Sequence, residues 1–549
     1  MGADASAGRD RIAVFAGPTA TILNSATLQV NEPPVLRPQR LAAPAVVYVK
    51  AFSGHPLERD ASELYAPPDG YVDQGGVFHT VDEDPPEGAE PVYKTTLDPE
   101  GGVYLLPYVA RPKTGGCWAS ATTAAALAED YAAEELRQTH YPDAARVYEE
   151  IDRLGLDVDG RCGLLTELAD FVHLRAIPPG GFRTSEAAFG AGLTAPERNG
   201  RDYFGYTPVP CRAEPGPDAL VRATNLVQST LTEDPGVVGA QWLEGSPTIE
   251  ESLYWLNLLI DTDRPIVGHA AQRPHGTLGS DGGRNIVDGA RYIVSRVWQG
   301  EDGGDTVGAV LIADQRIFAS REVAKTDARP GNYEAVGGHG GVLGSTGGAF
   351  GGPVLSFRPT RRHTRYSDLR LTVLPEIVGG TRIDPAGGRR RVEVRVKAGV
   401  RQLAAGCVPA VRIVKFGRYA SPCCPGGEVA EWVAHASTSH PLAGVVGEGQ
   451  SPYGWLDPAA ERALREAAFS GMPVVKCGRG NTGGFASQQA PWFVQGSNLT
   501  SSKARLLLMA SMLKLGSLPV AADPAAPTVV ELEATAAAVQ QYQALFDSH

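Results

Sequence analysis

Residues 237–270, VVGAQWLEGSPTIEESLYWLNLLIDTDRPIVGHA, contain three consecutive apolar patterns. VVGAQWLEG is typical of a strand that ends in turn residues, TIEESLYWLNLLI of a helix, and RPIVGHA of a second strand. A helix that connects two strands of one sheet makes them parallel. The sequence therefore predicts a parallel sheet with active residues at the carboxyl ends of its strands.

The helix of this unit has one apolar face and a defined start. Its apolar residues recur at helical spacing: Ile249, Leu253, Leu256 and Ile260. Thr248 and Glu251 have the spacing of a capping box, in which each side chain bonds the backbone at the helix start. Ser246 and Pro247 come just before that start, so a hydroxyl is predicted at the mouth of the strand.

Strand and helix patterns continue toward the carboxyl terminus. VGAVLIADQRIFASREVAKT, residues 307–326, predicts two strands around a tight turn at Asp314 and Gln315, with Lys325 at the far end. Residues 339–410 are rich in glycine and then basic and β-like, which indicates a second insertion and a domain boundary. After them, LAGVVGEGQ, DPAAERALREAAFSG and MPVVKCGRG repeat the strand, helix, strand order of an α/β domain.

The amino-terminal part combines one strand with a long irregular region. IAVFA, residues 12–16, is followed by Gly17 and Pro18 and predicts a buried strand that delivers Thr19 and Thr21 to the loop after it. Residues 31–210 are rich in proline and glycine and contain one helical pattern, SATTAAALAEDYAAEELRQ. A loop of this length without packing is improbable in a compact protein, so we expect an insertion that acts as a lid or an oligomer contact.

These patterns predict an α/β protein of two domains. A chain of 549 residues is too long for one ordinary core. We expect a larger amino-terminal parallel-sheet domain at residues 1–395, with insertions at about 31–210 and 339–395. Residues 396–549 are expected to form the smaller carboxyl-terminal α/β domain.

Composition excludes several classes of partner. The 50 basic and 62 acidic residues give a net charge of -12 without a basic stripe, so no nucleic acid partner is expected. The start carries charges where a secretory signal is apolar, and no stretch reaches ~18 apolar residues; we expect a cytoplasmic protein without a membrane partner. Seven cysteines, with Cys423 beside Cys424, suit reduced thiols, and the 11 histidines form no HExxH motif. We expect no metal and no cofactor.

Three separated groups suggest one kind of chemistry. A threonine after the first strand, Ser246 before the helix and Lys325 at a hairpin end are the parts of amide hydrolysis by a hydroxyl nucleophile with a lysine base. A buried lysine can hold the neutral amine that accepts the hydroxyl proton, and main-chain N–H groups at the helix start can stabilise an oxyanion. Each group also has an ordinary explanation: a helix-start serine, a surface lysine, and threonines that favour strands.

Ordered motifs resemble those of the L-asparaginase and glutaminase family. Residues 244–295 look like the family's second signature, which runs HGTDT, EET, a helix, AMRP, SADG and N. The matching residues are Gly245, Ser246, Thr248, Glu250, Glu251, Arg273, Pro274, Ser280, Asp281, Gly282 and Asn285. SREVAKTDA resembles REVTKTNT, NLTSSKARLLLMASMLK resembles the small-domain NPQKARILL segment, and GPTATI resembles GGTI. The resemblance implies the family's two-domain fold and covers about a third of the chain.

The resemblance also implies site residues. It places Thr21 on the family's first catalytic threonine, with Thr19 as the rival by a two-residue shift. Ser246 replaces the second catalytic threonine, and Lys325 matches the proton-accepting lysine. The family forms tetramers from intimate dimers, and the match around Lys503 implies a homodimer or homotetramer.

The substrate-recognition segment departs from the family pattern at Pro247. The family has there an aspartate that pairs with the substrate α-ammonium, and proline offers neither a carboxylate nor an N–H. Without that negative neighbour the neutral amine needed for base catalysis is favoured. Glu244, next to Gly245, replaces a histidine, and either Glu244 or Glu214 could supply a substitute carboxylate. The ordinary explanation for both glutamates is a surface carboxylate.

Three hypotheses follow for function. The first is hydrolysis of a small carboxamide other than free asparagine, through acyl transfer to Thr21 or Ser246 and then to water. The second is a true asparaginase or glutaminase with a substitute carboxylate, or a hydrolase of lactams or cyclic imides. The third is an inactive ligand-binding or scaffold protein, against which the retained hydroxyl and amine argue.

Overall fold

The structure is a computed structural model of the chain. It describes residues 10–17, 45–49, most of 70–97, a few residues between 148 and 174, and 217–549 without 274–280, 329–332, 348–350, 384–388, 417–426, 481–483 and 485–489. The helix expected at residues 120–138, Cys423 and Cys424 lie outside the described residues. By its contacts the chain divides into two units, residues 1–214 with 241–245 and 269–290, and residues 215–240 with 246–268 and 291–549. The boundary between residues 395 and 396 stays a prediction.

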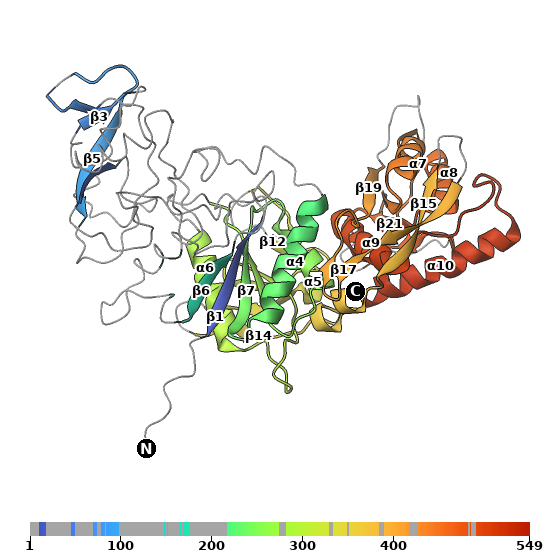
Figure 1. Cartoon of the computed structure of the whole chain (residues 1–549), viewed down its shortest axis with the longest axis horizontal. Coiled ribbons are helices and arrows are strands. Elements are labelled where there is room, and N and C mark those ends of the chain that lie inside the picture. The colour runs from blue at the N-terminus through green and yellow to red at the C-terminus, as the bar shows by residue number, and fades with distance from the viewer. Residues whose placement is uncertain are drawn as a thin grey trace. The chain divides into compact units, whose positions relative to one another are not determined.

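The main sheet is mixed, not parallel throughout. Its strand order is β14 (Val354–Leu355), β13 (Val342–Ser345), β10 (Arg316–Ala319), β9 (Val310–Ala313), β8 (Ile266–His269), β7 (Val237–Leu243), β1 (Arg11–Ala16) and β6 (Asp170–Leu174). Figure 1 labels β14, β7, β1 and β6 of this sheet. β1 pairs with β6 and β8 with β9 in parallel, whereas β9, β10, β13 and β14 pair antiparallel. Asp314 and Gln315 both have positive φ, the geometry of a two-residue hairpin turn, and this turn makes β10 antiparallel to β9.

The predicted strand, helix, strand unit is confirmed as β7, α5 (Ile249–Leu259) and β8. The four apolar residues predicted on one helix face are all buried. The predicted capping box is wrong, because the Thr248 side chain makes no capping bond and Glu251 pairs with Arg505. Arg505 lies on α9 (Ser501–Leu515), so a tertiary ion pair has replaced the local cap. The other helices of this part are α4 (Pro217–Glu233) and α6 (Gly282–Ser295).

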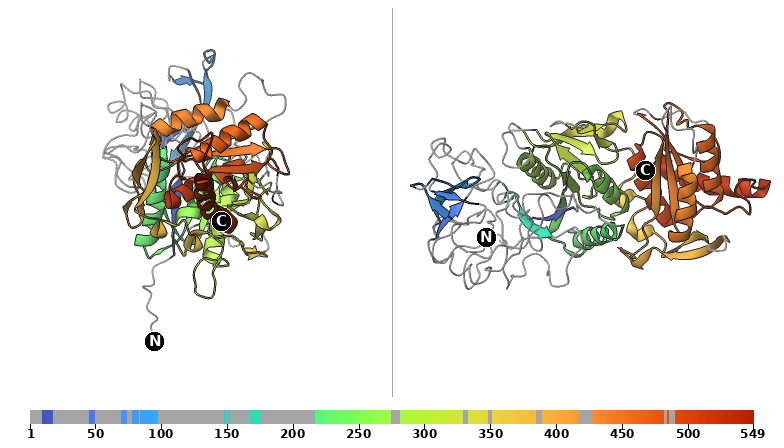
Figure 2. Two further views of the ribbon diagram at one scale, coloured as in Figure 1. Left: turned by 90° about the vertical axis from the view of Figure 1, so that its right-hand side faces the viewer. Right: turned by 90° about the horizontal axis from the view of Figure 1, so that it is seen from above.

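A second, parallel sheet forms the carboxyl-terminal α/β layer, as predicted. Its order is β19 (Ala410–Lys415), β20 (Ala443–Gly449), β21 (Val474–Gly478) and β22 (Val494–Gln495), with helices α7 (Gly427–Ser439), α8 (Pro458–Phe469), α9 and α10 (Val529–Ser548). A Cβ added at Gly444 of β20 would lie 3.1 Å from Leu508 of α9, and one at Gly447 would lie 3.0 Å from Leu464 of α8. Successive residues face opposite sides of a strand, so Gly444 and Gly447, three residues apart, face opposite sides and helices cover both faces of this sheet (Figure 2).

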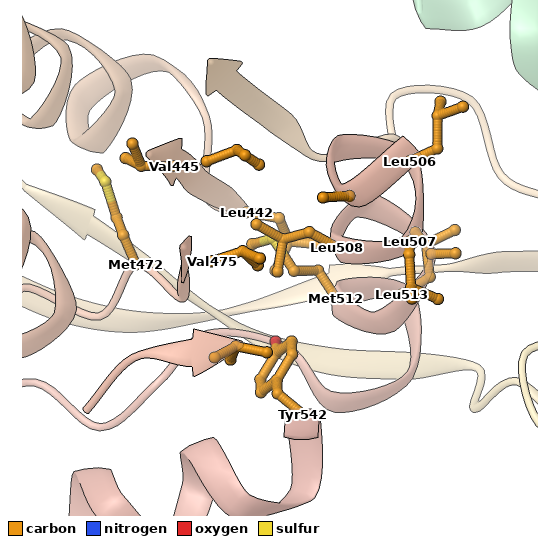
Figure 3. Close-up of a cluster of buried hydrophobic side chains, with 14 of the residues drawn as sticks. Leu442, Val445, Met472, Val475, Leu506, Leu507, Leu508, Met512, Leu513 and Tyr542 are labelled. Atoms are coloured by element: carbon orange, nitrogen blue, oxygen red, sulfur yellow. The ribbon is translucent and has the colours of Figure 1, made fainter. Parts of the chain in front are cut away.

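The core of this part is apolar and continuous. Figure 3 shows Leu508 and Met512 of α9 directed toward Leu442 and Val475 of the sheet. All four side chains are buried. Burial of a leucine-sized side chain contributes about 1.5–3 kcal/mol, so this layer fixes the position of α9.

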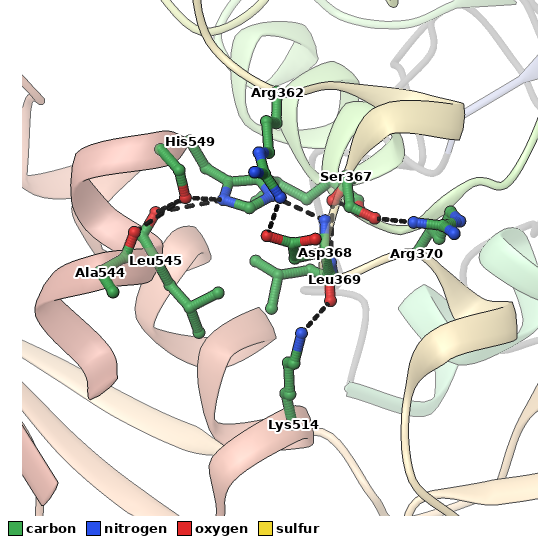
Figure 4. Close-up of polar contacts among 11 residues, drawn as sticks. Arg362, Ser367, Asp368, Leu369, Arg370, Lys514, Ala544, Leu545 and His549 are labelled. Carbon is green, nitrogen blue, oxygen red and sulfur yellow. Dashed lines mark hydrogen bonds and ion pairs between the residues drawn. The ribbon is translucent and has the colours of Figure 1, made fainter.

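Short elements precede and follow the last strands of the main sheet. They are η4 (His339–Gly341), η5 (Thr364–Tyr366), η6 (Leu371–Val373) and the strands β15 (Ile377–Ile383), β16 (Arg389–Arg395), β17 (Lys397–Gly399) and β18 (Gln402–Leu403). The stretch between η5 and η6 is held by polar contacts to the last helices. The Asp368 N–H donates to His549 Nε2 at 3.0 Å, and Lys514 Nζ donates to the Asp368 carbonyl at 2.8 Å (Figure 4). Burial lowers the pKa of His549 to about 4, which keeps the imidazole neutral and able to accept at neutral pH.

Within residues 31–210, predicted as the first insertion, four of the described strands form a separate small sheet, whereas β6 belongs to the main sheet and pairs with β1. The order of the small sheet is β2 (Ala45–Val49), β5 (Glu90–Leu97), β3 (Gly70–Val72) and β4 (Phe78–Thr80). The expected role of residues 31–210 as a lid or an oligomer contact stays a prediction. In the part of the chain that is described, no helix is long and apolar enough to cross a membrane.

A buried aspartate predicts how stability depends on pH. The Asp305 carboxylate accepts the N–H groups of Val307 at 2.9 Å and Gly308 at 2.8 Å, and burial raises its pKa to about 7. Between about pH 4 and 7 the native state therefore binds a proton that the unfolded chain lacks, so stability falls as pH rises, at roughly 1.4 kcal/mol per pH unit. In urea unfolding at pH 5 to 8, Asp305→Asn is expected to flatten this decline. Equal slopes for both proteins would contradict it.

Candidate active site

Ser246 lies in the loop that follows β7 and precedes α5. β7 ends at Leu243, and the loop from Glu244 to Thr248 leads into the first helical residue, Ile249. Ser246 is half-buried and Pro247 is exposed. The positive end of the α5 dipole therefore points toward the loop that holds the serine hydroxyl.

Lys325 contacts Ser246. The amine belongs to β11 (Val323–Lys325), a short strand after the β9–β10 hairpin that pairs with β12 (Tyr333–Ala335). Lys325 Nζ lies 2.7 Å from Ser246 Oγ, and the Tyr333 hydroxyl donates to the Ser246 carbonyl at 2.9 Å. Lys325 and Tyr333 are cross-strand partners, so one strand pair fixes Ser246 through both its side chain and its main chain.

Glu250 connects α5 to the strand that carries the lysine. Its carboxylate accepts the main-chain N–H of Lys325. Burial raises the pKa of Glu250, while Lys503 and the Lys325 N–H oppose that rise. A carboxylate in the first turn of α5 thus holds the backbone of β11 against the helix.

Glu244 is buried, which corrects the expectation of a surface carboxylate. Its side chain is 5% exposed and accepts the Trp242 indole N–H at 2.7 Å. The Gly17 N–H donates to the Leu243 carbonyl at 2.7 Å, and a Cβ at Gly17 would lie 2.9 Å from the Glu244 Cδ. The end of β1 therefore lies against the end of β7, and a side chain at position 17 would require the Glu244 side chain to shift.

The motif residues after β8 build a loop. The Asp281 carboxylate accepts the N–H groups of Gln272 at 3.0 Å and Arg273 at 2.9 Å, and Asn285 Nδ2 donates to the Ala270 carbonyl at 2.8 Å. These contacts satisfy backbone groups at the carboxyl end of a strand. They give Asp281 and Asn285 a structural role that the sequence pattern alone did not indicate.

Several predicted site residues lie outside the described residues. They are Thr19, Thr21 and Glu214, together with Pro274 and Ser280 of the resemblance. Gly245 is described as half-buried between Glu244 and Ser246. Of the predicted site residues that the structure describes, it brings Ser246 and Lys325 into contact. In the same described part, no cluster of three His, Cys, Asp or Glu side chains could hold a metal ion.

Sequence reasoning missed Tyr333, the role of Glu250 and the position of Lys503. Glu250 and Lys503 were present in motifs that resemble the family, but nothing in a one-dimensional pattern shows which backbone groups they meet. Tyr333 had no signal apart from its place eight residues after Lys325. Its partner is a main-chain carbonyl, which every residue carries.

Comparison with protein-family models shows which family this part of the chain is related to. Residues 216–335 match the family model described as asparaginase, N-terminal. This segment belongs to the asparaginase N-terminal family. Ser246, Lys325 and Tyr333 all fall within it, so the lysine–serine contact lies in the part of the chain where the family is shown.

The relationship to individual asparaginases is distant and partial. The chain is 23% identical over 304 residues to L-asparaginase 2 of Bacillus subtilis (strain 168), covering 54% of this chain and 66% of that protein. It is 32% identical over 95 residues to the glutaminase-asparaginase of Acinetobacter glutaminasificans, covering 17% and 27%. It thus spans less than two thirds of each of these relatives. A crystal structure from Campylobacter jejuni, described as a probable cytoplasmic L-asparaginase, aligns with a TM-score of 0.48 at 17% identity, covering 74% of this chain and 92% of that one.

Proposed function

We propose that the protein is an asparaginase-like amidohydrolase that cleaves a small carboxamide other than free asparagine. The observation that carries this proposal is the 2.7 Å contact between Lys325 Nζ and Ser246 Oγ. A serine hydroxyl needs a neighbour that accepts its proton, and a lysine amine at this distance is within reach of a direct transfer.

The reaction would proceed by acyl transfer. The neutral Lys325 amine takes the proton of the attacking hydroxyl, whose oxygen adds to the amide carbon and forms a tetrahedral oxyanion. Collapse breaks the C–N bond, and the leaving ammonia or amine takes the proton back from the Lys325 ammonium. Water then adds to the acyl ester and loses its proton to the same amine. Collapse breaks the bond between the acyl carbon and the enzyme oxygen, which takes the proton back from the Lys325 ammonium, and the carboxylic acid is released. The positive end of the α5 dipole favours the oxyanion.

Two hydroxyls could be the attacking group. Ser246 has the observed contact with the amine, and Thr21, or Thr19 by a shift of two residues, is the threonine that the resemblance implies. The family pattern needs both a threonine and the lysine-bound hydroxyl. Trapping the acyl-enzyme and identifying the modified peptide would assign the nucleophile.

The specificity part of the proposal rests on Pro247 and Glu244. Pro247 has no carboxylate for a substrate ammonium group, and charge-assisted hydrogen bonds of this kind contribute about 1.5–3 kcal/mol. Glu244 is the candidate substitute, but its carboxylate is buried and accepts the Trp242 indole N–H. This engagement supports an amide without an α-ammonium group over free asparagine. Partners beyond the substrate, including a homodimer or homotetramer, stay predictions.

The proposal is tested by release of ammonia or amine from a substrate panel. The panel contains simple amides, peptidyl amides, lactams, cyclic imides, asparagine and glutamine. We expect turnover of at least one linear amide and little aspartate from millimolar asparagine. Efficient asparagine hydrolysis would favour the second hypothesis, and no turnover across the panel would favour an inactive ligand-binding protein.

Substitution of Pro247 by aspartate is expected to create asparagine turnover. The new carboxylate can bind a substrate ammonium, and about 1.5–3 kcal/mol corresponds to a gain of roughly 10- to 100-fold in kcat/KM. Pro247→Asn is the matched control because it has the same shape without the charge. Equal behaviour of the two variants toward asparagine would refute the proposed reason for the altered specificity.

A further inference from the structure

Lys503 is a buried cation outside the family segment. It lies in the first turn of α9, where its N–H donates to the N-cap Thr500 at 3.3 Å. The side chain is 1% exposed. A buried ammonium group is costly unless its donors are paired, so its contacts define what it does.

The Lys503 ammonium binds two main-chain carbonyls from separate segments. It donates to the Glu250 carbonyl and, at 2.5 Å, to the Ser320 carbonyl, and it lies 5.2 Å from the centre of the Tyr254 ring. Two main-chain carbonyls, one in the first turn of α5 and one in the turn after β10, thus converge on one nitrogen. The ammonium group therefore links two backbone segments through hydrogen bonds.

Each of these backbones carries one member of the lysine–serine pair. Glu250 is in the first turn of α5, four residues after Ser246. Ser320 begins the turn that joins β10 to β11, five residues before Lys325. The Glu250 carboxylate then accepts the Lys325 N–H, which closes a chain of contacts from α9 through α5 to β11.

We propose that Lys503 is a positioning residue that sets the distance between Ser246 Oγ and Lys325 Nζ by fixing the start of α5 against the β10–β11 turn. This inference rests on the proposed amidohydrolase function for its effect on rate. It assigns to α9, a helix of the carboxyl-terminal layer, a part in the site of the amino-terminal family segment. Lys503 itself touches no reacting atom.

The charge on Lys503 is sensitive to pH. Burial lowers its pKa to about 8, and the nearby carboxylates of Glu250, Glu322 and Glu251 oppose that change. Arg321 from the β10–β11 turn adds a like charge, and Arg505 of α9 is engaged with Glu251. Above about pH 8 the Lys503 ammonium therefore becomes a neutral amine, and its hydrogen bonds to the two carbonyls weaken.

The test compares Lys503→Met, which removes the amine, with Lys503→Arg, which stays charged. Lys503→Met is expected to lower kcat by about 10- to 100-fold with KM changed little, because a misplacement near 1 Å costs about 100-fold. Lys503→Arg is expected to restore part of kcat and to lose less activity than the wild type between pH 7.5 and 9.5. Lys514→Met is the control, since Lys514 lies in the same helix but binds the Asp368 carbonyl.

Hydrogen exchange separates positioning from general destabilisation. In Lys503→Met we expect faster exchange in peptides covering residues 246–254 and 320–328, without a change in β20 and β21. Faster exchange throughout, or unchanged kcat and exchange in both Lys503 variants, would overturn the inference. If the wild type cleaves no amide, the proposed function fails, and the local exchange difference still decides whether Lys503 holds the two segments.

Discussion

Substitution of Lys325 by methionine is expected to abolish most amide turnover while the protein stays folded. The amine lies 2.7 Å from Ser246 Oγ, and general-base catalysis contributes about 100- to 10,000-fold. Methionine keeps the length and apolar stem of the side chain, so the β11–β12 pairing should persist. We expect kcat to fall by about 1,000-fold, measured as ammonia release from the best substrate of the panel.

The matched control for this substitution is Lys415→Met. The Lys415 side chain is 68% exposed at the end of β19 and pairs with Glu448 outside the site. An exposed pair of this kind contributes about 0–1 kcal/mol, so the control should keep wild-type kcat and stability. Full activity in Lys325→Met with unchanged melting would exclude the lysine as the base.

Much of the fold could be predicted from the sequence, because its helices and strands follow local patterns of apolar residues. β7, α5 and β8 follow from apolar patterns and from the turn residues between them, and the positive-φ turn at Asp314 and Gln315 makes a hairpin. The α/β fold is confirmed, and the main sheet is mixed in part because this predicted turn sets β10 antiparallel to β9. The capping box failed because Arg505, 254 residues from Glu251, offers a better partner than the local backbone.

Only part of the candidate site could be predicted from the sequence, because contacts between distant residues leave no local pattern. Ser246 and Lys325 were identifiable because hydroxyl and amine side chains are the reagents of the chemistry. Glu244 was expected at the surface, but the indole of Trp242 satisfies its carboxylate in the interior. Lys503 acts on main-chain carbonyls, and a sequence records no property of a carbonyl that would single out Glu250 or Ser320.

Substitution of Ser246 gives the second large expected effect. Comparing an alanine with a threonine at this position distinguishes a requirement for the hydroxyl from a requirement for packing. Ser246→Ala removes the oxygen that Lys325 contacts, and we expect kcat to fall by about 100- to 10,000-fold. Ser246→Thr keeps a hydroxyl at the position where the family has threonine, so we expect it to stay within about tenfold of the wild type, as a single extra methyl at a half-buried site allows.

The pH dependence of the Ser246 variants adds an independent criterion. If the hydroxyl is deprotonated by Lys325, Ser246→Thr should keep the acidic limb of the wild-type profile, because the base is unchanged. The residual activity of Ser246→Ala should lose that limb unless a threonine, Thr21 or Thr19, also delivers its proton to Lys325. Ser246→Ala could instead keep a residual rate with the same acidic limb as the wild type, and this rate could be lost on further substitution of Thr21. That result would assign the attack to the threonine. Ser246 would then relay the proton between the threonine hydroxyl and the amine.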